Sequence, residues 1–235
     1  MKALILMTRI PIPGKTKTRL MEILTGRECA EIHKCFLLDL FYVFEFLKDD
    51  IDIFLTYTPE DSLNKIKDML PEYIQHFPQE GSKLGDRMSN AIGYVFKKGY
   101  DHVLLIGSDI PDIKVCEIKD AFEILKDKDI CIGPTFDGGY YLIGMKKLYT
   151  ELFHDSLKWG NKTVLEGTLD IANNLDLKVG IAAKHMDIDT KEDLFALKER
   201  IDNGSFDYKE SPWNTINFVN RCWSDMDHVK RQAKG

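Results

Sequence analysis

The chain lacks several of the patterns by which common protein classes are identified. Its five cysteines include no C-x-x-C pair, which argues against a disulfide framework and against a zinc knuckle. No apolar run approaches the ~20 residues of a membrane-spanning helix, and the apolar opening gives way to Thr8, Arg9 and Pro11 too early for a secretory signal. We therefore expect reduced cysteines, no membrane span and a cytoplasmic protein.

Positive charge and catalytic motifs are also scarce. The 32 basic residues are outnumbered by 38 acidic ones, and the net charge of −6 argues against a nucleic acid partner, which normally binds a basic face. The six histidines have no H-E-x-x-H spacing, so a histidine-bound catalytic zinc is unsupported. No G-x-S-x-G motif is present, which removes the best indication of a serine hydrolase.

What the sequence does contain is the alternation typical of an α/β protein. Apolar runs rich in β-branched residues alternate with longer segments of helical period, as in sheets built from βαβ units. We expect strands at 3–7, 51–58, 73–77, 102–107, 129–133, 139–145 and 177–182. We expect helices at 26–47, 59–69, 84–97, 115–125, 147–153, 162–174 and 191–201.

The length and the end of this pattern predict how the chain is divided. A chain of 235 residues, against ~150 for a usual domain, favours one large domain with an appendage. The periodic pattern dissolves beyond residue 203. We therefore assign residues 1–203 to the domain and residues 204–235 to an aromatic and polar C-terminal extension of unknown role.

The loop after the first strand is rich in positive charge. It carries Arg9, Lys15, Lys17 and Arg19 between a buried strand and a helix. Clustered cations and free backbone N–H groups at such a junction suit phosphate oxygens. For this loop taken alone, a solvated basic turn is the alternative.

Two acidic loops also follow buried strands. Asp109 comes directly after the strand at 102–107, at the edge of the sheet where open α/β folds bind ligands. Asp187 and Asp189 follow the strand at 177–182. Carboxylates at one edge could share a Mg²⁺ ion, which is commonly held by one or two carboxylates plus substrate phosphates. Each loop also precedes a helix, so capping is the alternative: Asp109 would cap the first helix, and Asp189 or Thr190 the second, which starts with Lys191, Glu192 and Asp193.

A third segment, at 133–144, combines paired glycines with a carboxylate and two tyrosines. Gly138 and Gly139 allow the backbone to approach a ligand closely, and Asp137 and Tyr140 can bond to one or stack against it. A simple hairpin with a D-G turn is the alternative.

Taken together, these segments resemble one protein family. The matching stretches are PIPGKTKTRL at 11–20, LGDRM at 84–88, IGSDIP at 106–111, GP at 133–134, DGGYYLIG at 137–144, WG at 159–160 and DIDT at 187–190. In this order they resemble the GT-A fold glycosyltransferases of the arsenosugar-biosynthesis type, which are similar to phospholactate guanylyltransferase and to molybdenum-cofactor nucleotidyltransferases. The sequence departs from that pattern at Arg9, where lysine is usual, and at Asn161, where Ser or Thr is usual.

The resemblance implies a three-layer α/β/α fold with a mostly parallel mixed sheet, and a set of site residues. A Mg²⁺ or Mn²⁺ ion would be held by Asp109 and Asp189, with Asp187 less favoured than Asp189. The implied nucleotide-binding residues are Arg9, Gly14, Lys15, Lys17, Arg19, Gln79, Gly81, Leu84, Gly85, Arg87 and Ser108. The implied acceptor-binding residues are Asp137, Gly138, Gly139, Tyr140 and Trp159.

The expected activity is that of a metal-dependent glycosyltransferase with a nucleotide-diphospho-sugar donor and a hydroxylated small-molecule acceptor. Lys17 and Arg19 would act in catalysis by neutralising the leaving nucleoside diphosphate, and Asp137 by orienting or deprotonating the acceptor hydroxyl. One alternative is a nucleotidyltransferase that joins a nucleoside triphosphate to a phosphorylated small molecule and releases pyrophosphate. Another is a nucleotide-binding module that has lost its chemistry. The expected assembly is a monomer or a homodimer.

Overall fold

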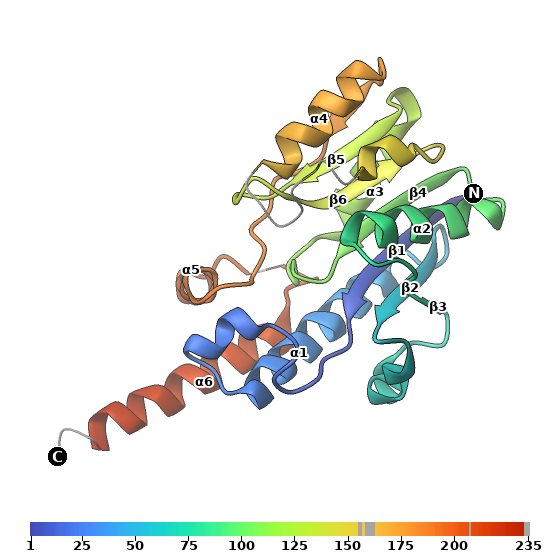
Figure 1. The fold of residues 1–235 in the computed structure, drawn as a ribbon. Coiled ribbons are helices and arrows are strands. Elements are labelled where there is room, and N and C mark those ends of the chain that lie inside the picture. Colours follow the sequence, from blue (N-terminus) through green and yellow to red (C-terminus); the bar gives the residue numbers. More distant parts are fainter. Residues whose placement is uncertain (155–156, 158–162, 207, 233–235) are drawn as a thin grey trace.

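The computed structural model describes residues 1–154, 157, 163–206 and 208–232, and it shows a three-layer α/β/α fold (Figure 1). Seven strands form one mixed sheet in the order β3-β2-β1-β4-β6-β5-β7. They are β1 (Lys2–Arg9), β2 (Asp52–Thr58), β3 (Gln75–Pro78), β4 (His102–Gly107), β5 (Ile130–Pro134), β6 (Tyr140–Met145) and β7 (Val179–Ile181). Within the described residues, β6 alone runs antiparallel to its neighbours. The predicted α/β fold with a mostly parallel sheet is therefore confirmed.

Helices cover both faces of the sheet. The α-helices of the described residues are α1 (Gly26–Glu45), α2 (Leu84–Lys97), α3 (Val115–Asp127), α4 (Val164–Asn174), α5 (Lys191–Asp202) and α6 (Trp213–Gln232). α1 and α3 pack on one face, where Leu4 of β1 is buried, and α2 and α4 pack on the other, where Ile5 is buried. Successive residues of a strand point to opposite faces, so one continuous apolar run supplies both cores. In the described part of the chain, every helix is too short or too polar to cross a membrane.

Two segments that were predicted as α-helices contain only short 3₁₀ helices. Segment 59–69 forms two short 3₁₀ helices, η2 (Glu60–Lys65) and η3 (Lys67–Met69), and segment 147–153 forms only η4 (Thr150–Phe153). At the start of η2 the hydroxyl of Ser62 donates to the carbonyl of Pro59. Such a local side-chain bond competes with the α-helical ladder, and short 3₁₀ turns are common in connections of this kind.

The largest departure from the prediction is α6, which lies where the sequence showed no regular pattern. Its buried residues Ile216, Val219 and Cys222 are three apart, as on one face of a helix, but the intervening residues are mixed. This face packs with Phe36 of α1 and Leu194 of α5 in a third apolar cluster. Figure 1 shows α6 lying beside α1. The described part of the extension is thus folded against the predicted domain, and the division at residue 203 stays a prediction.

The first turn of α6 is capped by a carboxylate that belongs to α1. Asp39 is 3% exposed and accepts the backbone N–H groups of Asn214 and Thr215 at 3.0 and 2.9 Å. It also accepts the side-chain donors of the same two residues at 2.8 and 2.6 Å. The first N–H groups of a helix have no partner within it, so Asp39 satisfies donors that α6 cannot. Burial raises the pKa of Asp39, although these four bonds favour its ionised form.

The connections bring several segments to one edge of the sheet. β1 pairs with β4 in parallel, and the start of β6 lies beside the end of β4, with Leu142 opposite Ile106. The segment after β7 returns to this edge, because the N–H of Ile188 donates to the carbonyl of Asp109 at 2.9 Å. The loops that follow β1, β4, β5 and β7 therefore meet where the sequence analysis places the candidate site.

Replacing Asp39 with alanine is expected to lower the free energy of unfolding by about 2–4 kcal/mol, because buried donors at the start of α6 lose their acceptor. Denaturant-induced unfolding measures the change. Glu31→Ala is the matched control, since it removes an exposed ion pair with Arg221 between the same two helices and should cost under about 1 kcal/mol. Equal losses in the two variants would contradict the capping role of Asp39.

Candidate functional site

A cavity of about 750 Å³ opens at the edge of the sheet where β1 and β4 end. Its walls come from those strand ends, residues 15–19, the start of α2, the turn between β5 and β6, and the segment after β7. In open α/β sheets, ligands bind beyond the carboxyl ends of the strands. The cavity is therefore the candidate site.

Most residues that the sequence analysis assigned to the site line this cavity. Those that do are Arg9, Lys15, Lys17, Arg19, Gln79, Leu84, Arg87, Ser108, Asp109, Asp137, Gly139, Tyr140 and Asp189. The assigned residues that are not part of the lining are Gly14, Gly81, Gly85 and Gly138. Trp159 lies outside the described residues. Gly14, Gly81 and Gly138 have positive φ angles, so they shape the turns that carry lining residues.

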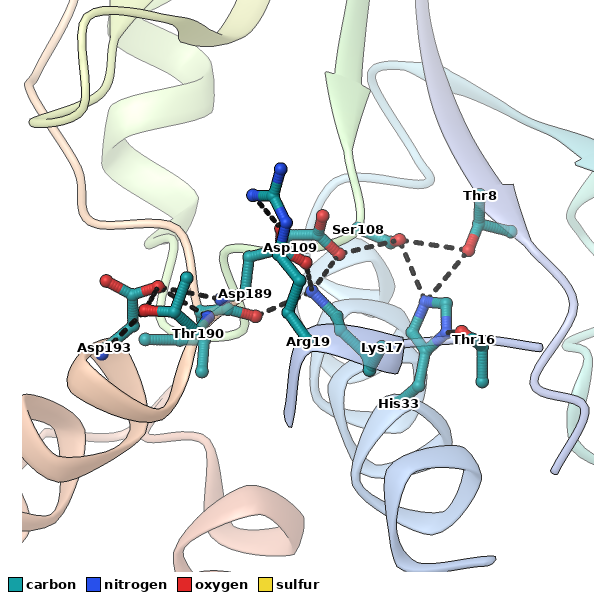
Figure 2. Close-up of polar contacts among 11 residues, drawn as sticks. Thr8, Thr16, Lys17, Arg19, His33, Ser108, Asp109, Asp189, Thr190 and Asp193 are labelled. Atoms are coloured by element: carbon teal, nitrogen blue, oxygen red, sulfur yellow. Dashed lines mark hydrogen bonds and ion pairs between the residues drawn. The ribbon is translucent and has the colours of Figure 1, made fainter. Parts of the chain in front are cut away.

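Lys17 lies at the centre of the site, between the two carboxylates that were predicted to hold a metal (Figure 2). Its Nζ is 2.6 Å from Oδ1 of Asp109 and 3.7 Å from Oδ1 of Asp189. The same Nζ donates to the carbonyl of Ile188 at 2.6 Å. The side chain is 3% exposed, so this ammonium is a buried cation that joins the basic loop to both acidic loops.

The structure excludes helix capping as the role of Asp109. α3 begins only at Val115, and its first turn is capped by Glu117, which accepts the N–H of Lys114 at 2.8 Å. Burial by itself would raise the pKa of Asp109, but the ammonium of Lys17 outweighs it and holds that pKa below its usual range. Asp109 is therefore an ionised carboxylate at neutral pH.

Thr190, rather than Asp189, caps α5. The Oγ1 of Thr190 accepts the N–H of Asp193 at 3.3 Å, and the carboxylate of Asp193 accepts the N–H of Thr190 at 2.7 Å. This reciprocal pair is a capping box. The carboxylate of Asp189 is left for the site, where Arg19 donates to it at 2.9 Å.

The carboxylates at this point are ligands of the type that a hard divalent cation prefers, and in this structure they contact the ammonium of Lys17 and the guanidinium of Arg19. Oxygens of Asp109 and Asp189 converge on one ammonium, so a single positive charge already lies between them. Carboxylate oxygens suit Mg²⁺ and Mn²⁺, and Mg²⁺ is commonly held by one or two carboxylates plus substrate phosphates. In the described part of the chain, no group of three or more His, Cys, Asp or Glu side chains could hold a metal. A metal at this point would therefore need oxygens from a substrate.

Further cations line the same cavity. Arg9 and Lys15 are exposed, and neither has an ion-pair partner among the residues that the structure describes. Arg19 is 66% exposed although it bonds to Asp189. Exposed cations without a protein anion match the oxygens of an anionic ligand. This loop can therefore receive phosphate groups without first losing an ion pair at Arg9 or Lys15.

Another part of the wall is acidic. Oδ1 of Asp137 accepts the hydroxyl of Thr135 at 2.5 Å and the N–H of Gly139 at 2.9 Å, so Asp137 stabilises the turn between β5 and β6 as well as lining the cavity. Burial, with the negative charge of Asp137 as the next cause, raises the pKa of Asp187 to about 6. Two carboxylates in this wall disfavour further negative charge there.

Gln79 presents a fixed acceptor to the cavity. Its amide nitrogen donates to the carbonyls of Thr8 at 2.9 Å and Thr56 at 3.3 Å. These two acceptors fix which end of the amide is the nitrogen, because a carbonyl oxygen there would face two other carbonyl oxygens. The side-chain oxygen has no partner among the described residues, and it is available to a ligand.

The sequence analysis missed His33, Thr8 and Thr16. His33 is 2% exposed in the middle of α1, and hydroxyls lie close to both of its ring nitrogens (Figure 2). The spacing of the histidines excludes an H-E-x-x-H motif and gives no indication of a buried histidine at the site. The available signal was a polar residue within the apolar part of α1, next to Ile32 and three residues before Phe36.

Comparison with known proteins shows that the chain is similar to nucleotide-dependent transferases. A crystal structure from Desulfovibrio desulfuricans G20, described provisionally as a nucleotide-diphospho-sugar transferase, matches with a TM-score of 0.84 and 32% identity, covering 99% of this chain and 98% of that chain. The 2-phospho-L-lactate guanylyltransferase of Methanocaldococcus jannaschii is 31% identical over 131 residues, which are 55% of this chain and 54% of that protein. The chain thus matches about half the length of this curated relative.

Two other matches concern the sequence family and the fold alone. A family model described as an uncharacterized protein conserved in bacteria, DUF2064, matches residues 46–161. The 4-diphosphocytidyl-2C-methyl-D-erythritol synthase of Anaerococcus prevotii DSM 20548 has a TM-score of 0.56 at 15% identity, covering 86% of this chain and 96% of that chain. At that identity the likeness shows the shared fold alone.

The likeness to the Desulfovibrio protein extends over almost the whole of both chains, and it includes the sheet whose edge carries the cavity. The narrower resemblance to the arsenosugar-biosynthesis type stays a prediction. The chain belongs to the family of the nucleotide-diphospho-sugar transferases, and it is a transferase.

Proposed function

We propose that the protein is a metal-dependent glycosyltransferase that uses a nucleotide-diphospho-sugar donor and a hydroxylated small-molecule acceptor. The observation that carries the proposal is the division of charge within one cavity. The end of β1 and the loop after it supply the cations Arg9, Lys15 and Arg19, whereas Asp137 and Asp187 make another part of the wall acidic. A diphosphate matches the first part, and an acceptor without a phosphate group matches the second.

The donor's diphosphate is bound by Arg9 at the end of β1 and by the loop that follows. Arg9 and Lys15 have no ion-pair partner among the described residues, and the exposed guanidinium of Arg19 can reach ligand oxygens while its Nη1 bonds to Asp189. Negative charge grows on the leaving nucleoside diphosphate, and fixed cations that stabilise it contribute several kcal/mol in typical cases. Gln79 and Leu84 line the part of the cavity assigned to the nucleoside.

Asp109 and Asp189 are the residues that would hold Mg²⁺ or Mn²⁺, which supplies a Lewis acid to phosphate oxygens when bound. The chain's own contribution is to keep these carboxylates ionised and oriented. Lys17 does so by bonding to Asp109 and to the carbonyl of Ile188, and Arg19 by bonding to Asp189.

The acceptor is oriented by Asp137. Thr135 and Gly139 both bond to its Oδ1, so the second oxygen can accept an acceptor hydroxyl and take its proton. The ring of Tyr140 lines the cavity, and its hydroxyl is buried near Thr168 of α4. A ring held in this way offers a flat apolar face to a sugar or a nucleoside.

Nucleotidyl transfer is the second candidate, and the likeness to the guanylyltransferase favours it. In that reaction a phosphate oxygen of the acceptor attacks the α-phosphorus of a nucleoside triphosphate, a P–O bond forms, and pyrophosphate leaves. The same cations and carboxylates would serve both reactions. The acidic wall separates them, because it repels a phosphorylated acceptor.

Asp109→Asn is expected to keep the fold and to abolish the enhancement of nucleotide binding by divalent cations. The amide oxygen of Asn can still accept the bond from Lys17, but it carries no charge for a metal. Isothermal titration with nucleoside diphosphates, with and without Mg²⁺ or Mn²⁺, measures the effect. Metal dependence equal to that of the native protein would exclude Asp109 as a ligand.

Arg19→Ala is expected to weaken the binding of nucleoside diphosphates about tenfold while changing the affinity for the matching nucleosides little, because the lost contact is to phosphate. The comparison uses the same titrations across the common bases. Arg27→Ala, an exposed arginine outside the cavity, is the matched control and should change neither. Equal weakening of diphosphates and nucleosides by Arg19→Ala would mean that Arg19 supports the fold of the loop.

Product analysis decides between the two reactions. We expect the protein with Mn²⁺, a pool of nucleotide-diphospho-sugars and a metabolite extract to release nucleoside diphosphate. Asp137→Asn should lower that rate by about 100-fold without loss of donor binding, because the amide keeps the turn but cannot take a proton. Metal-dependent pyrophosphate from triphosphates, with the sugar donors left intact, would establish the nucleotidyltransferase instead.

A further inference from the structure

His33 connects three separate segments of the candidate site through hydroxyl groups. Its Nδ1 is 2.6 Å from Oγ1 of Thr16 in the loop after β1. Its Nε2 is 3.2 Å from Oγ1 of Thr8 at the end of β1 and 3.0 Å from Oγ of Ser108 just after β4. All four residues line the cavity, and the imidazole is 2% exposed. Both nitrogens of a single buried ring are thus used to tie these segments together (Figure 2).

The two ends of this arrangement lie next to the buried ion pair. Thr16 precedes Lys17, and Ser108 precedes Asp109. The bonds to His33 therefore fix the backbone on both sides of the contact between the Lys17 ammonium and the Asp109 carboxylate, which is 2.6 Å long. The hydrogen bonds of His33 with Thr16, Thr8 and Ser108, which we call the His33 tie, attach the loop to the sheet without a charge. The ion pair attaches it a second time.

The backbone of the loop shows why such a tie is needed. Lys17 has φ 49° and ψ 41°, a left-handed conformation that is uncommon for residues other than glycine. Conformations of this kind persist when surrounding contacts over-determine them. The bond between Thr16 and His33 immediately precedes this residue and provides one of those contacts.

The imidazole acts in its neutral form. Burial, with the positive charge of Lys17 as the next cause, lowers the pKa of His33 to about 4. A neutral ring has one donor and one acceptor, so it donates to a hydroxyl at one nitrogen and accepts from a hydroxyl at the other. It adds no charge beside Lys17, which a lysine or arginine in its place would do.

We propose that His33 is a positioning residue, which holds the loop after β1 against the ends of β1 and β4 so that Lys17 and the neighbouring cations are in place before a phosphate ligand binds. The inference rests on the proposed function of the cavity as a site for a nucleotide diphosphate. Pre-organisation of this kind improves affinity because the loop loses less freedom on binding.

Two conservative variants separate the two ends of the tie. An Asn side chain places its amide near the position of Nδ1, so His33→Asn retains a partner for Thr16. A Gln side chain reaches the position of Nε2, so His33→Gln retains a partner for Thr8 and Ser108. His33→Leu retains neither. The probes are inorganic pyrophosphate with Mg²⁺, measured by isothermal titration, and hydrogen–deuterium exchange of residues 14–19.

We expect His33→Leu and His33→Gln to accelerate exchange in residues 14–19 and to weaken pyrophosphate binding about tenfold, the effect of roughly one hydrogen bond. His33→Asn, which keeps the bond to Thr16 but loses the bonds to Thr8 and Ser108, should show a smaller loss than His33→Leu in both measurements. Native-like exchange and affinity in His33→Leu would overturn the proposal. Should His33→Leu fail to fold, Thr16→Val removes the same bond from the other side and should reproduce the loss.

Thr215→Val is the matched control. Its hydroxyl is also buried and also lies 2.6 Å from a side-chain atom of α1, to which it donates, but at the contact with α6, far from the loop in sequence. It should lower thermal stability while leaving pyrophosphate affinity and loop exchange unchanged. A loss of affinity here equal to that of Thr16→Val would mean that stability alone explains the effect and would refute the positioning role.

The same experiments distinguish a failure of the proposed function from a failure of this inference. If the native protein does not bind pyrophosphate, the cavity is not a diphosphate site, whereas the exchange of residues 14–19 still reports on the tie. If the native protein binds pyrophosphate and the His33 variants bind it equally well, the site stands and the role of His33 is wrong.

Discussion

The buried ammonium of Lys17 is the interaction on which the arrangement of the site depends. A charge removed from water is costly unless it is paired and hydrogen-bonded, and Lys17 meets this condition only by contacting Asp109, Asp189 and the carbonyl of Ile188 together. Those partners belong to segments that follow β4 and β7. The electrostatic requirement of one side chain therefore brings three distant parts of the chain to a single point.

α1 provides the frame for that point because it is buried on more than one side. One part of its surface packs on the sheet with α3, and another packs with α5 and α6. From this helix His33 is directed to the loop after β1, whereas Asp39 is directed to the first turn of α6. The helix that supports the cavity thus also holds the C-terminal helix, although the two contacts use different faces.

The chemistry assigned to the site follows from where charge is paired and where it is not. Lys17 is engaged by protein groups, which supports the proposal that it fixes Asp109 and Asp189. Arg9 and Lys15 have no ion-pair partner among the described residues, which supports the proposal that they bind the ligand. The carboxylates of Asp137 and Asp187 lie in the wall of the same cavity. This asymmetry favours a phosphate-bearing donor and an acceptor without phosphate, and it is the structural basis for preferring sugar transfer to nucleotidyl transfer. A cytoplasmic location and a monomeric or homodimeric assembly stay predictions.

The sequence by itself determined the elements whose signals are local. The continuous apolar run at 102–107 predicted β4 and placed Asp109 at the ligand-binding edge, and the Thr190 and Asp193 pair marks the start of α5 with a capping box. Only the tertiary structure decided that Asp109 pairs with Lys17 instead of capping a helix, that α6 is capped by Asp39, and that His33 belongs to the site. Asp39 and Thr215 are 176 positions apart in the sequence, and His33 and Ser108 are 75 positions apart. Lys17 and Ile188 are 171 positions apart. Such bonds form after the chain has folded back on itself, so no short sequence pattern encodes them.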